Sequence, residues 1–215
     1  MNKILSTAVL AIATLAGSAQ AAGITGLVNT GLDAQGTQDT SYALFSVESG
    51  TVTDGYAYVS KDNVWPVGTW LANTDVSRWI TPTADQAESL DPSADGKYTF
   101  RLSFDLTGYN ASTAAFTGHF AADNSAEIYL NGTKLTGATG FTSWHDFSAS
   151  SGFLAGPNTL DFVLTNDAQG SGNPAGLRVE FASSNVSAVP EPETYAMLMA
   201  GLGLVGFAAR RRKAA

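Results

Sequence analysis

The chain has 215 residues, of which 11 are basic and 19 acidic, and its formal net charge is −8. An acidic chain is repelled by nucleic acid and by anionic lipid, so a nucleic-acid partner is excluded. The sequence contains no cysteine, which excludes disulfides, thiolate metal sites and cysteine nucleophiles.

The N-terminus has the pattern of a secretory signal peptide. Lys3 supplies the positive end, residues 4–15 form an apolar core, and Ala19-Gln20-Ala21 matches the small-x-small cleavage pattern. We expect cleavage after Ala21, which makes residues 1–21 a signal peptide and the rest an exported protein. The alternative is a plain N-terminal membrane anchor, for which the apolar core is short.

Residues 22–188 form the body, which is predicted to consist of strands and turns. From Tyr98 to Leu106 apolar and polar residues alternate strictly, the pattern of a strand with one buried face. Asn131-Gly132 is a hairpin-turn pair. Short strands at this spacing are typical of sandwiches and jelly rolls, so we predict an all-β, single-domain body. Whether residues 22–38 form an edge strand or a loose leader stays open. Further strands are predicted at 42–47, 56–59, 126–130, 158–164 and 177–181.

Four tryptophans in the body offer flat apolar rings that could stack on sugars. An exposed ring beside a charged or amide side chain would make a carbohydrate site, whereas tryptophans in a sandwich also pack the core or close its ends. Both interpretations stay open. Trp65 and Trp144 are two of the four; the candidate carbohydrate contacts are Trp70, Trp79 and Arg78, with Asn73 and Asp75 as nearby polar partners.

Asp91-Pro-Ser-Ala-Asp95-Gly96 has the opening spacing of a calcium loop, with oxygen ligands at positions 1, 3 and 5 and glycine at 6. The bidentate glutamate expected at position 12 is replaced by Leu102, and a capped turn explains the same residue types. Asp123, which lies before another strand, could hold an ion or satisfy turn amides. We therefore expect no cofactor, with a structural calcium ion at Asp91, Asp95 and Asp123 as the alternative.

The sequence contains no catalytic motif that positions a nucleophile or a metal. His119 and His145 are the only histidines, and neither Gly-x-Ser-x-Gly nor His-Glu-x-x-His occurs. A glycosidase needs only two carboxylates, but no feature of the acidic body singles out a pair. We predict that the protein is not an enzyme and keep a polysaccharide hydrolase as the less favoured alternative.

The body resembles galactose-binding-like jelly-roll modules over roughly residues 60–182. The resemblance implies a single jelly-roll β-sandwich, an architecture that hosts lectins, enzyme accessories and inert spacers. The residues that carry it are 118–124, Ile128-Tyr-Leu-Asn-Gly132, Phe147, Gly156-Pro-Asn-Thr-Leu160 and 162–166, together with Trp70 to Pro82.

The last 27 residues, 189–215, combine a helix breaker, an apolar run and a basic end. Val189-Pro190-Glu191-Pro192 precedes the run at 195–209, and Arg210, Arg211 and Arg212 follow it. As a helix the run would be about 22 Å long, against a hydrocarbon core of about 30 Å. The arginines should stay cytoplasmic and leave the body outside. We predict a single, short membrane helix; an ordinary tail anchor without cleavage is the alternative.

The tail from Val189 to Arg212 resembles the PEP-CTERM sorting signal of Gram-negative bacteria that make exopolysaccharide. The resemblance implies that exosortase, a membrane-embedded protease/transpeptidase, recognises Pro190-Glu191-Pro192 and removes the tail after transient residence in the inner membrane. We therefore expect an exported, non-enzymatic protein of the cell envelope, outer surface or extracellular biofilm matrix. Its expected partners are exosortase, the membrane before processing, and cell-surface or extracellular polysaccharide. The alternative function is that of a lectin-like carbohydrate-binding module.

Overall fold

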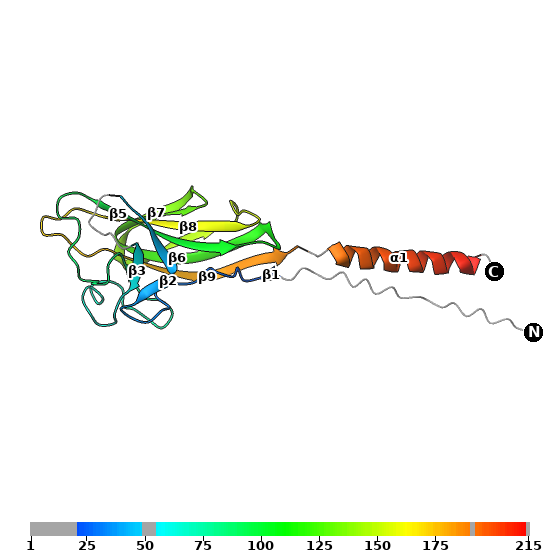
Figure 1. Ribbon diagram of the computed structural model, residues 1–215, viewed down its shortest axis with the longest axis horizontal. Coiled ribbons are helices and arrows are strands. Elements are labelled where there is room, and N and C mark those ends of the chain that lie inside the picture. The colour runs from blue at the N-terminus through cyan, green and yellow to red at the C-terminus, as the bar shows by residue number, and fades with distance from the viewer. Residues whose placement is uncertain (1–20, 49–54, 190–191, 214–215) are drawn as a thin grey trace, which may run out of the picture.

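The computed structural model of the protein describes residues 21–48, 55–189 and 192–213 (Figure 1). The predicted signal peptide lies outside the described residues except for Ala21, as do Pro190 and Glu191 of the predicted sorting signal. The elements are β1 (Ala21–Ala22), β2 (Gln38–Glu48), β3 (Tyr56–Val59), β4 (Ile80–Thr81), β5 (Gly96–Asp105), β6 (Tyr109–Leu130), β7 (Thr133–Ala149), β8 (Pro157–Asn166), β9 (Gly176–Ala188) and α1 (Pro192–Lys213).

The strands form one antiparallel ladder that closes on itself. Their order is β1-β9-β4-β3-β2-β5-β8-β6-β7, and β9 also pairs with β6. Seven strands, from β9 through β4, β3, β2, β5 and β8 to β6, therefore make a barrel-like closed sheet. The predicted all-β body is confirmed. It differs from a sandwich of two separate sheets because β6 hydrogen-bonds to strands of both layers.

β6 and β7 are long because each contributes to two layers. Residues 109–123 of β6 pair with β9, and residues 125–130 pair with β8. β7 follows β6 with two arms, residues 133–140 and 145–149, and its register shifts between them. The ring centroids of Phe147 in the second arm and Phe162 in β8 are 5.9 Å apart, so the core closes between the layers.

The alternation seen in the sequence decides which side chains enter this core. Phe100, Leu102 and Phe104 of β5 are buried, while Lys97 and Ser103 of the same strand are exposed. Period-two alternation places successive side chains on opposite faces, so β5 has one dry face. The Asn131-Gly132 pair makes the two-residue turn between β6 and β7, with φ values of 49° and 80°, as a type I′ hairpin requires.

The two ends of the body meet at one pole. β1 pairs with the end of β9 through Ala21 with Ser187 and Ala22 with Val186. The segment between β1 and β2 is held along β9, because Thr30 N–H donates to Val179 O and Val179 N–H donates to Thr30 Oγ1. Residues 22–38 are therefore an ordered strap rather than a loose leader.

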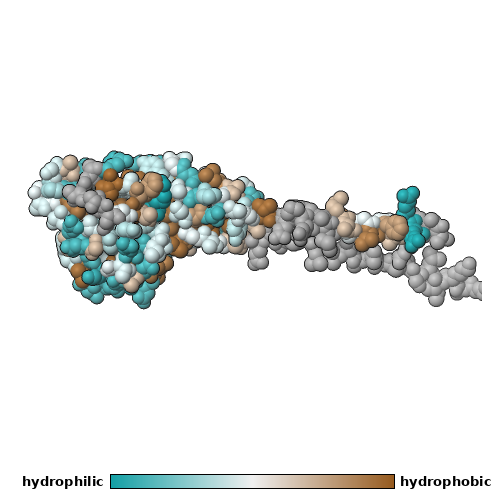
Figure 2. Space-filling view, viewed as in Figure 1, coloured by the Kyte–Doolittle hydropathy of each residue, from teal (hydrophilic) through white to brown (hydrophobic). Residues whose placement is uncertain are grey.

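α1 lies apart from the strands, beyond the end of β9 (Figure 1). Apolar side chains line its described part, and hydrophilic ones follow near its end (Figure 2). Leu198, Met199, Leu204 and Phe207 are exposed. Within the described residues, no helix combines the length and the hydropathy needed to span a membrane.

Candidate functional site

A depression with a volume of about 640 Å³ lies on the outer side of β2 and β5. We call it the β2–β5 face. Its floor is fixed by Asp39, whose carboxylate accepts backbone N–H bonds from Gly31, Ser41 and Tyr42 at 2.8–3.1 Å. Burial raises the pKa of Asp39, and the three backbone donors act against that rise. Tyr42 is buried beside it and donates its hydroxyl to Val28 O at 2.7 Å.

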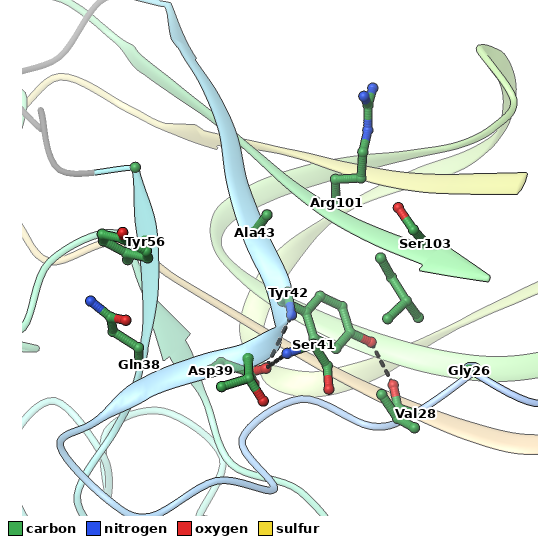
Figure 3. A pocket seen from close by; sticks show the side chains of 13 residues that line it. Gly26, Val28, Gln38, Asp39, Ser41, Tyr42, Ala43, Tyr56, Arg101 and Ser103 are labelled. Carbon is green, nitrogen blue, oxygen red and sulfur yellow. Dashed lines mark hydrogen bonds between the residues drawn. The ribbon is translucent and has the colours of Figure 1, made fainter. Parts of the chain in front are cut away.

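The polar side chains of the β2–β5 face come from two strands. Figure 3 shows Asp39, Ser41 and Tyr42 following one another along β2, while Arg101 of β5 points away from this floor. Gln38, Ser41 and Ser103 also line the depression. These groups can donate and accept hydrogen bonds at an open surface, which suits a hydroxylated ligand better than an apolar one.

Two exposed aromatic side chains are connected with the β2–β5 face, Tyr56 in its lining and Phe45 through its contact with Arg101. Phe45 is 58% exposed, and its ring lies 3.3 Å from the guanidinium carbon of Arg101. Tyr56 of β3 is 50% exposed and lines the depression. Arg101 is held by a two-bond ion pair with Asp161 at 2.6 and 2.7 Å, and this hydrogen bonding raises the pKa of Arg101. A fixed planar group under an exposed ring makes a rigid platform.

The platform continues across the sheet in one register row. Ala43 pairs with Arg101, Arg101 with Asp161, Asp161 with Tyr129, and Tyr129 with Lys134. Glu127, on the outer side of β6, binds both the Tyr129 hydroxyl and the Lys134 ammonium. The outer face of β2, β5, β8, β6 and β7 therefore carries paired polar groups, with Phe45 stacked on Arg101 at one end and Tyr129 near the other.

The tryptophans singled out in the sequence lie elsewhere and point inward. Trp70 and Trp79 are 2% and 0% exposed, and their ring centroids are 4.5 Å apart. Their indole N–H groups donate to Asp123 Oδ2 and Leu71 O at 2.7 and 2.8 Å. In this conformation neither ring offers a face to a sugar. The tryptophan cluster comprises Val67, Trp70, Trp79 and Ala121, with Leu71, Phe141 and Trp144 packed against it.

Of the other candidate contacts, Trp65 is exposed and Arg78 is engaged in ion pairs. Arg78 Nε lies 3.2 Å from Asp62 Oδ1, and its Nη2 lies 3.8 Å from Asp75 Oδ1. Asn73 is turned toward the backbone, where its Oδ1 accepts the Trp79 N–H at 3.0 Å. The structure therefore does not gather Trp70, Trp79 and Arg78 into one exposed sugar site.

A buried arginine ties the loop beside the tryptophan cluster to β9. Arg178 is 2% exposed and donates to Ser77 Oγ, Ala72 O, Thr74 Oγ1 and Glu180 Oε1. Burial lowers the pKa of Arg178. Glu180 lies between Ser77 and His119, at 2.6 and 3.0 Å. Ser77 thus contacts the Glu180 carboxylate and the Arg178 guanidinium. Among the described residues, no histidine contacts Ser77, as it would in a catalytic triad.

The three candidate calcium ligands accept hydrogen bonds from different parts of the protein. Asp91 Oδ2 accepts from Tyr98 Oη and Asn166 Nδ2, and Asp95 Oδ1 accepts from Ala168 N. Asp123 accepts the Trp70 indole N–H, and burial raises the pKa of Asp123 to about 6. Within the described part of the chain, no three acidic or histidine side chains are placed to hold a metal ion.

Sequence reasoning missed Phe45, Tyr56 and Arg101. Arg101 was visible as an outward position of the alternating strand from Tyr98 to Leu106. The orientation of Phe45 was ambiguous, because it is the extra residue of a β-bulge: Leu44 pairs with Phe100 and Ser46 with Thr99. Alternation counted from buried Leu44 places Phe45 outward, whereas alternation counted back from Val47, which packs against the core, places it inward. A bulge shifts the alternation by one residue, and nothing in the local sequence marks it.

The second candidate site is the junction of body and tail. Ala188 ends β9, and Val189 N–H donates to Gly108 O at 2.9 Å. Pro192 begins α1 only three residues later. The predicted processing motif therefore starts at Val189, the residue that makes the last backbone hydrogen bond of the described part of the body. Ala21, the predicted signal cleavage position, is the ladder partner of Ser187 and lies at the same pole.

Comparison with solved structures finds distant likeness only. A family 11 carbohydrate-binding module from Clostridium thermocellum, in complex with a β-1,3-1,4-mixed-linked tetrasaccharide, is 12% identical, with 71% of this chain and 91% of that chain covered and a TM-score of 0.35. A PA14 sugar-binding domain from an RTX adhesin is 16% identical with a TM-score of 0.27; the match covers 45% of this chain and 56% of that domain. A family 35 carbohydrate-binding module from an environmental isolate is 16% identical with a TM-score of 0.24, over 46% of this chain and 76% of that one. Likeness at this level assigns neither a ligand nor a fold family.

No curated protein matches the chain. The family model of the PEP-CTERM protein-sorting motif matches residues 188–213, which run from the last residue of β9 to the end of α1. This range contains Val189, Pro190, Glu191 and Pro192 and the arginines at 210–212. The chain therefore carries a PEP-CTERM sorting motif, which implies an exported protein that is processed by exosortase.

Proposed function

We propose that the protein is a non-enzymatic component of the cell surface or the exopolysaccharide matrix of a Gram-negative bacterium. It passes through the inner membrane on a short helix at residues 195–209 and is released from that helix by exosortase. The observation that carries the proposal is the position of the sorting motif, which begins at the last residue of a body that is folded without it. The proposed function requires no cofactor.

The body is arranged to be separated from both of its end segments. The members of both core clusters lie between Ile24 and Val186, and none belongs to α1. Cleavage after Ala21 and cleavage near Pro190 would remove no core side chain. A folded, acidic domain would remain outside the membrane, with its former attachment points together at one pole.

Truncation tests this function in the producing organism. A chain that stops after Ala188 should appear in the culture medium, whereas the full chain should stay cell-associated. A variant with Pro190→Ala and Pro192→Ala keeps the helix and should accumulate in the inner membrane at its uncleaved mass. If the truncated chain is as cell-associated as the full one, the sorting motif does not determine location and the proposal fails.

Carbohydrate binding is the second candidate function, and the β2–β5 face favours it. Exposed Phe45 and Tyr56 flank groups that can hydrogen-bond to hydroxyls, and Arg101 is held in place by Asp161. Sugar rings combine an apolar face with polar edges, so a fixed aromatic ring beside such groups complements them.

Co-sedimentation of residues 22–189 with the producing organism's own exopolysaccharide tests this candidate. We expect saturable binding that Phe45→Ala weakens roughly tenfold. Leu154→Ala is the matched control, because Leu154 is also exposed, whereas Phe45 stacks on Arg101 of the β2–β5 face. Equal binding by wild type and Phe45→Ala would remove the β2–β5 face as the site.

A further inference from the structure

β7 leaves one side of its backbone unused. It is a terminal strand of the ladder and pairs with β6 alone. Among the described residues, the Leu71 N–H that donates to Phe141 O at 2.9 Å is the only backbone group outside β6 that bonds to β7. The first arm, residues 133–140, therefore presents a row of amide and carbonyl groups to solvent. Such an edge is a template for another strand.

The stretch beside this edge lacks the usual protection against pairing. Residues 135–144 contain no charged side chain and no proline, whereas natural edge strands are commonly guarded by lysine, proline or inward charges. Lys134, just before the stretch, is bound to Glu127. Two copies of a chain with net charge −8 repel each other over most of their surfaces. The uncharged edge is a place where a second copy can approach without that repulsion.

The two arms of β7 also enclose a groove. It has a volume of about 550 Å³ and is lined by Leu135 and Thr136 of the first arm and by Asp146, Phe147 and Ser148 of the second. Leu135 packs against the main core and Phe147 belongs to it. A strand added to the first arm could place a side chain over this partly apolar floor, so pairing would bury apolar surface in addition to forming backbone hydrogen bonds.

The opposite end of the ladder cannot accept β7. β1 has two residues, and the same side of β9 is already occupied by the strap, where Thr30 N–H donates to Val179 O and Phe181 N–H donates to Asn29 Oδ1. If bodies stacked head to tail, with β7 of one copy on β1 of the next, the new strand pair would therefore be only two residues long. The remaining arrangement pairs β7 of one copy with β7 of a second copy. This interface is two-fold symmetric, so the assembly stops at a dimer.

We propose that the first arm of β7 pairs antiparallel with the same arm of a second copy, and that this pair joins molecules held on two facing surfaces. A two-fold axis that makes strands antiparallel reverses the strand direction between the copies. The strands run along the long axis of the body (Figure 1), so the poles that carry Ala21 and Ala188 point in opposite directions. This orientation rests on the proposed function only in that the processed body is held at the cell surface by its C-terminal end, which lies at that pole.

Sedimentation equilibrium of residues 22–189 tests the pairing without the tail. We expect a reversible monomer–dimer equilibrium that Thr139→Glu weakens roughly tenfold or more, because like charges face each other across an antiparallel pair. Ser112→Glu is the matched control: it adds the same charge at an exposed position of β6, an interior strand, and should leave dimerisation within about twofold. A monomer at about 1 mM, or equal weakening by both variants, overturns the proposal.

Vesicle clustering tests the orientation. Residues 22–189 with a C-terminal histidine tag are attached to vesicles that contain nickel-chelating lipid, so that no membrane helix is needed. We expect turbidity to rise with the wild-type body and to be lost with Thr139→Glu. A body that dimerises in solution without clustering vesicles contradicts the antiparallel arrangement. Because neither experiment contains the sorting motif, failure here is distinct from failure of the truncation test.

Discussion

The tryptophan cluster and the β2–β5 face contain similar residue types and use them in opposite ways. Trp70 and Trp79 are packed ring against ring, and each indole N–H has a partner inside the protein. Phe45 and Tyr56 are half exposed or more; Tyr56 lines an open depression, and Phe45 stacks on Arg101, which also lines it. The comparison teaches that residue type alone does not identify a ligand-binding aromatic. What decides is whether a loop folds over the ring, as at the tryptophans, or the ring lies on the outer face of a strand, as at Phe45.

The largest expected effect is on the packed side of this comparison. Trp79→Ala should lower the free energy of unfolding of residues 22–189 by about 3–5 kcal/mol, because it removes a fully buried ring and leaves a cavity beside Trp70. Urea denaturation followed by circular dichroism measures the change. A loss below about 1 kcal/mol would mean that the ring is not part of a packed core and would reopen its interpretation as a sugar contact.

Gly96→Ala probes the close packing at the start of β5. A Cβ at Gly96 would overlap the carboxylate of Asp91, which is itself held by Tyr98 and Asn166. We expect a destabilisation of about 1–3 kcal/mol from overpacking. Gly156→Ala is the control, since a Cβ added at Gly156 would meet nothing within 4 Å. In an Asp91→Ala background the Gly96→Ala cost should largely disappear; a cost that persists would place the strain elsewhere.

Asp123→Asn tests whether the cluster carries an unfavourable charge. Burial raises the pKa of Asp123 from 3.8 to about 6, so the folded state binds more protons than the unfolded state between these values, and stability falls as pH rises from about 4 to 6. The variant still accepts the Trp70 indole N–H but carries no charge. It should be more stable than wild type by about 1–2 kcal/mol at pH 7, and the difference should vanish near pH 4. Parallel melting curves at the two pH values give this result, and a pH-independent difference would contradict it.

The smallest expected effect is on the exposed side. Phe45→Ala should change the free energy of unfolding by no more than about 0.5 kcal/mol, because the ring is 58% exposed and contacts mainly Arg101. The same denaturation experiment used for Trp79 measures it. A loss of about 2 kcal/mol or more, on the scale of a buried side chain, would show that Phe45 supports the fold and would remove the contrast between the two regions.

Alternation and turn residues were sufficient to locate most strands. The stretch from Tyr98 to Leu106 coincides with β5 to within a few residues, and Asn131-Gly132 marks the β6–β7 turn. The length of β7 could not be predicted, because its threonines, glycines and serines show no regular alternation of apolar and polar residues. The ring closure also has no local signal, since it depends on β6 pairing with β8 and β9 at different places along its length.

The two candidate sites also differ in how well the sequence predicts them. The sorting motif is contiguous, so its order could be recognised in the sequence, and the family model matches it at 188–213. The β2–β5 face joins residues from separate strands, and one of its rings depends on a bulge. Burial of Trp70 and Trp79 depends on a loop that packs on Ala121 of β6, which sequence spacing does not reveal.

The pairing of Ala21 with Ser187 has a practical consequence for building with this domain. Neighbouring antiparallel strands lie about 5 Å apart, so the chain enters and leaves the body at nearly one point. A domain with adjacent ends can be spliced into a surface loop of another protein without stretching the host. Residues 21–188 should therefore serve as an insertable cassette, with the loops between β3 and β5 displayed at the far end from the host.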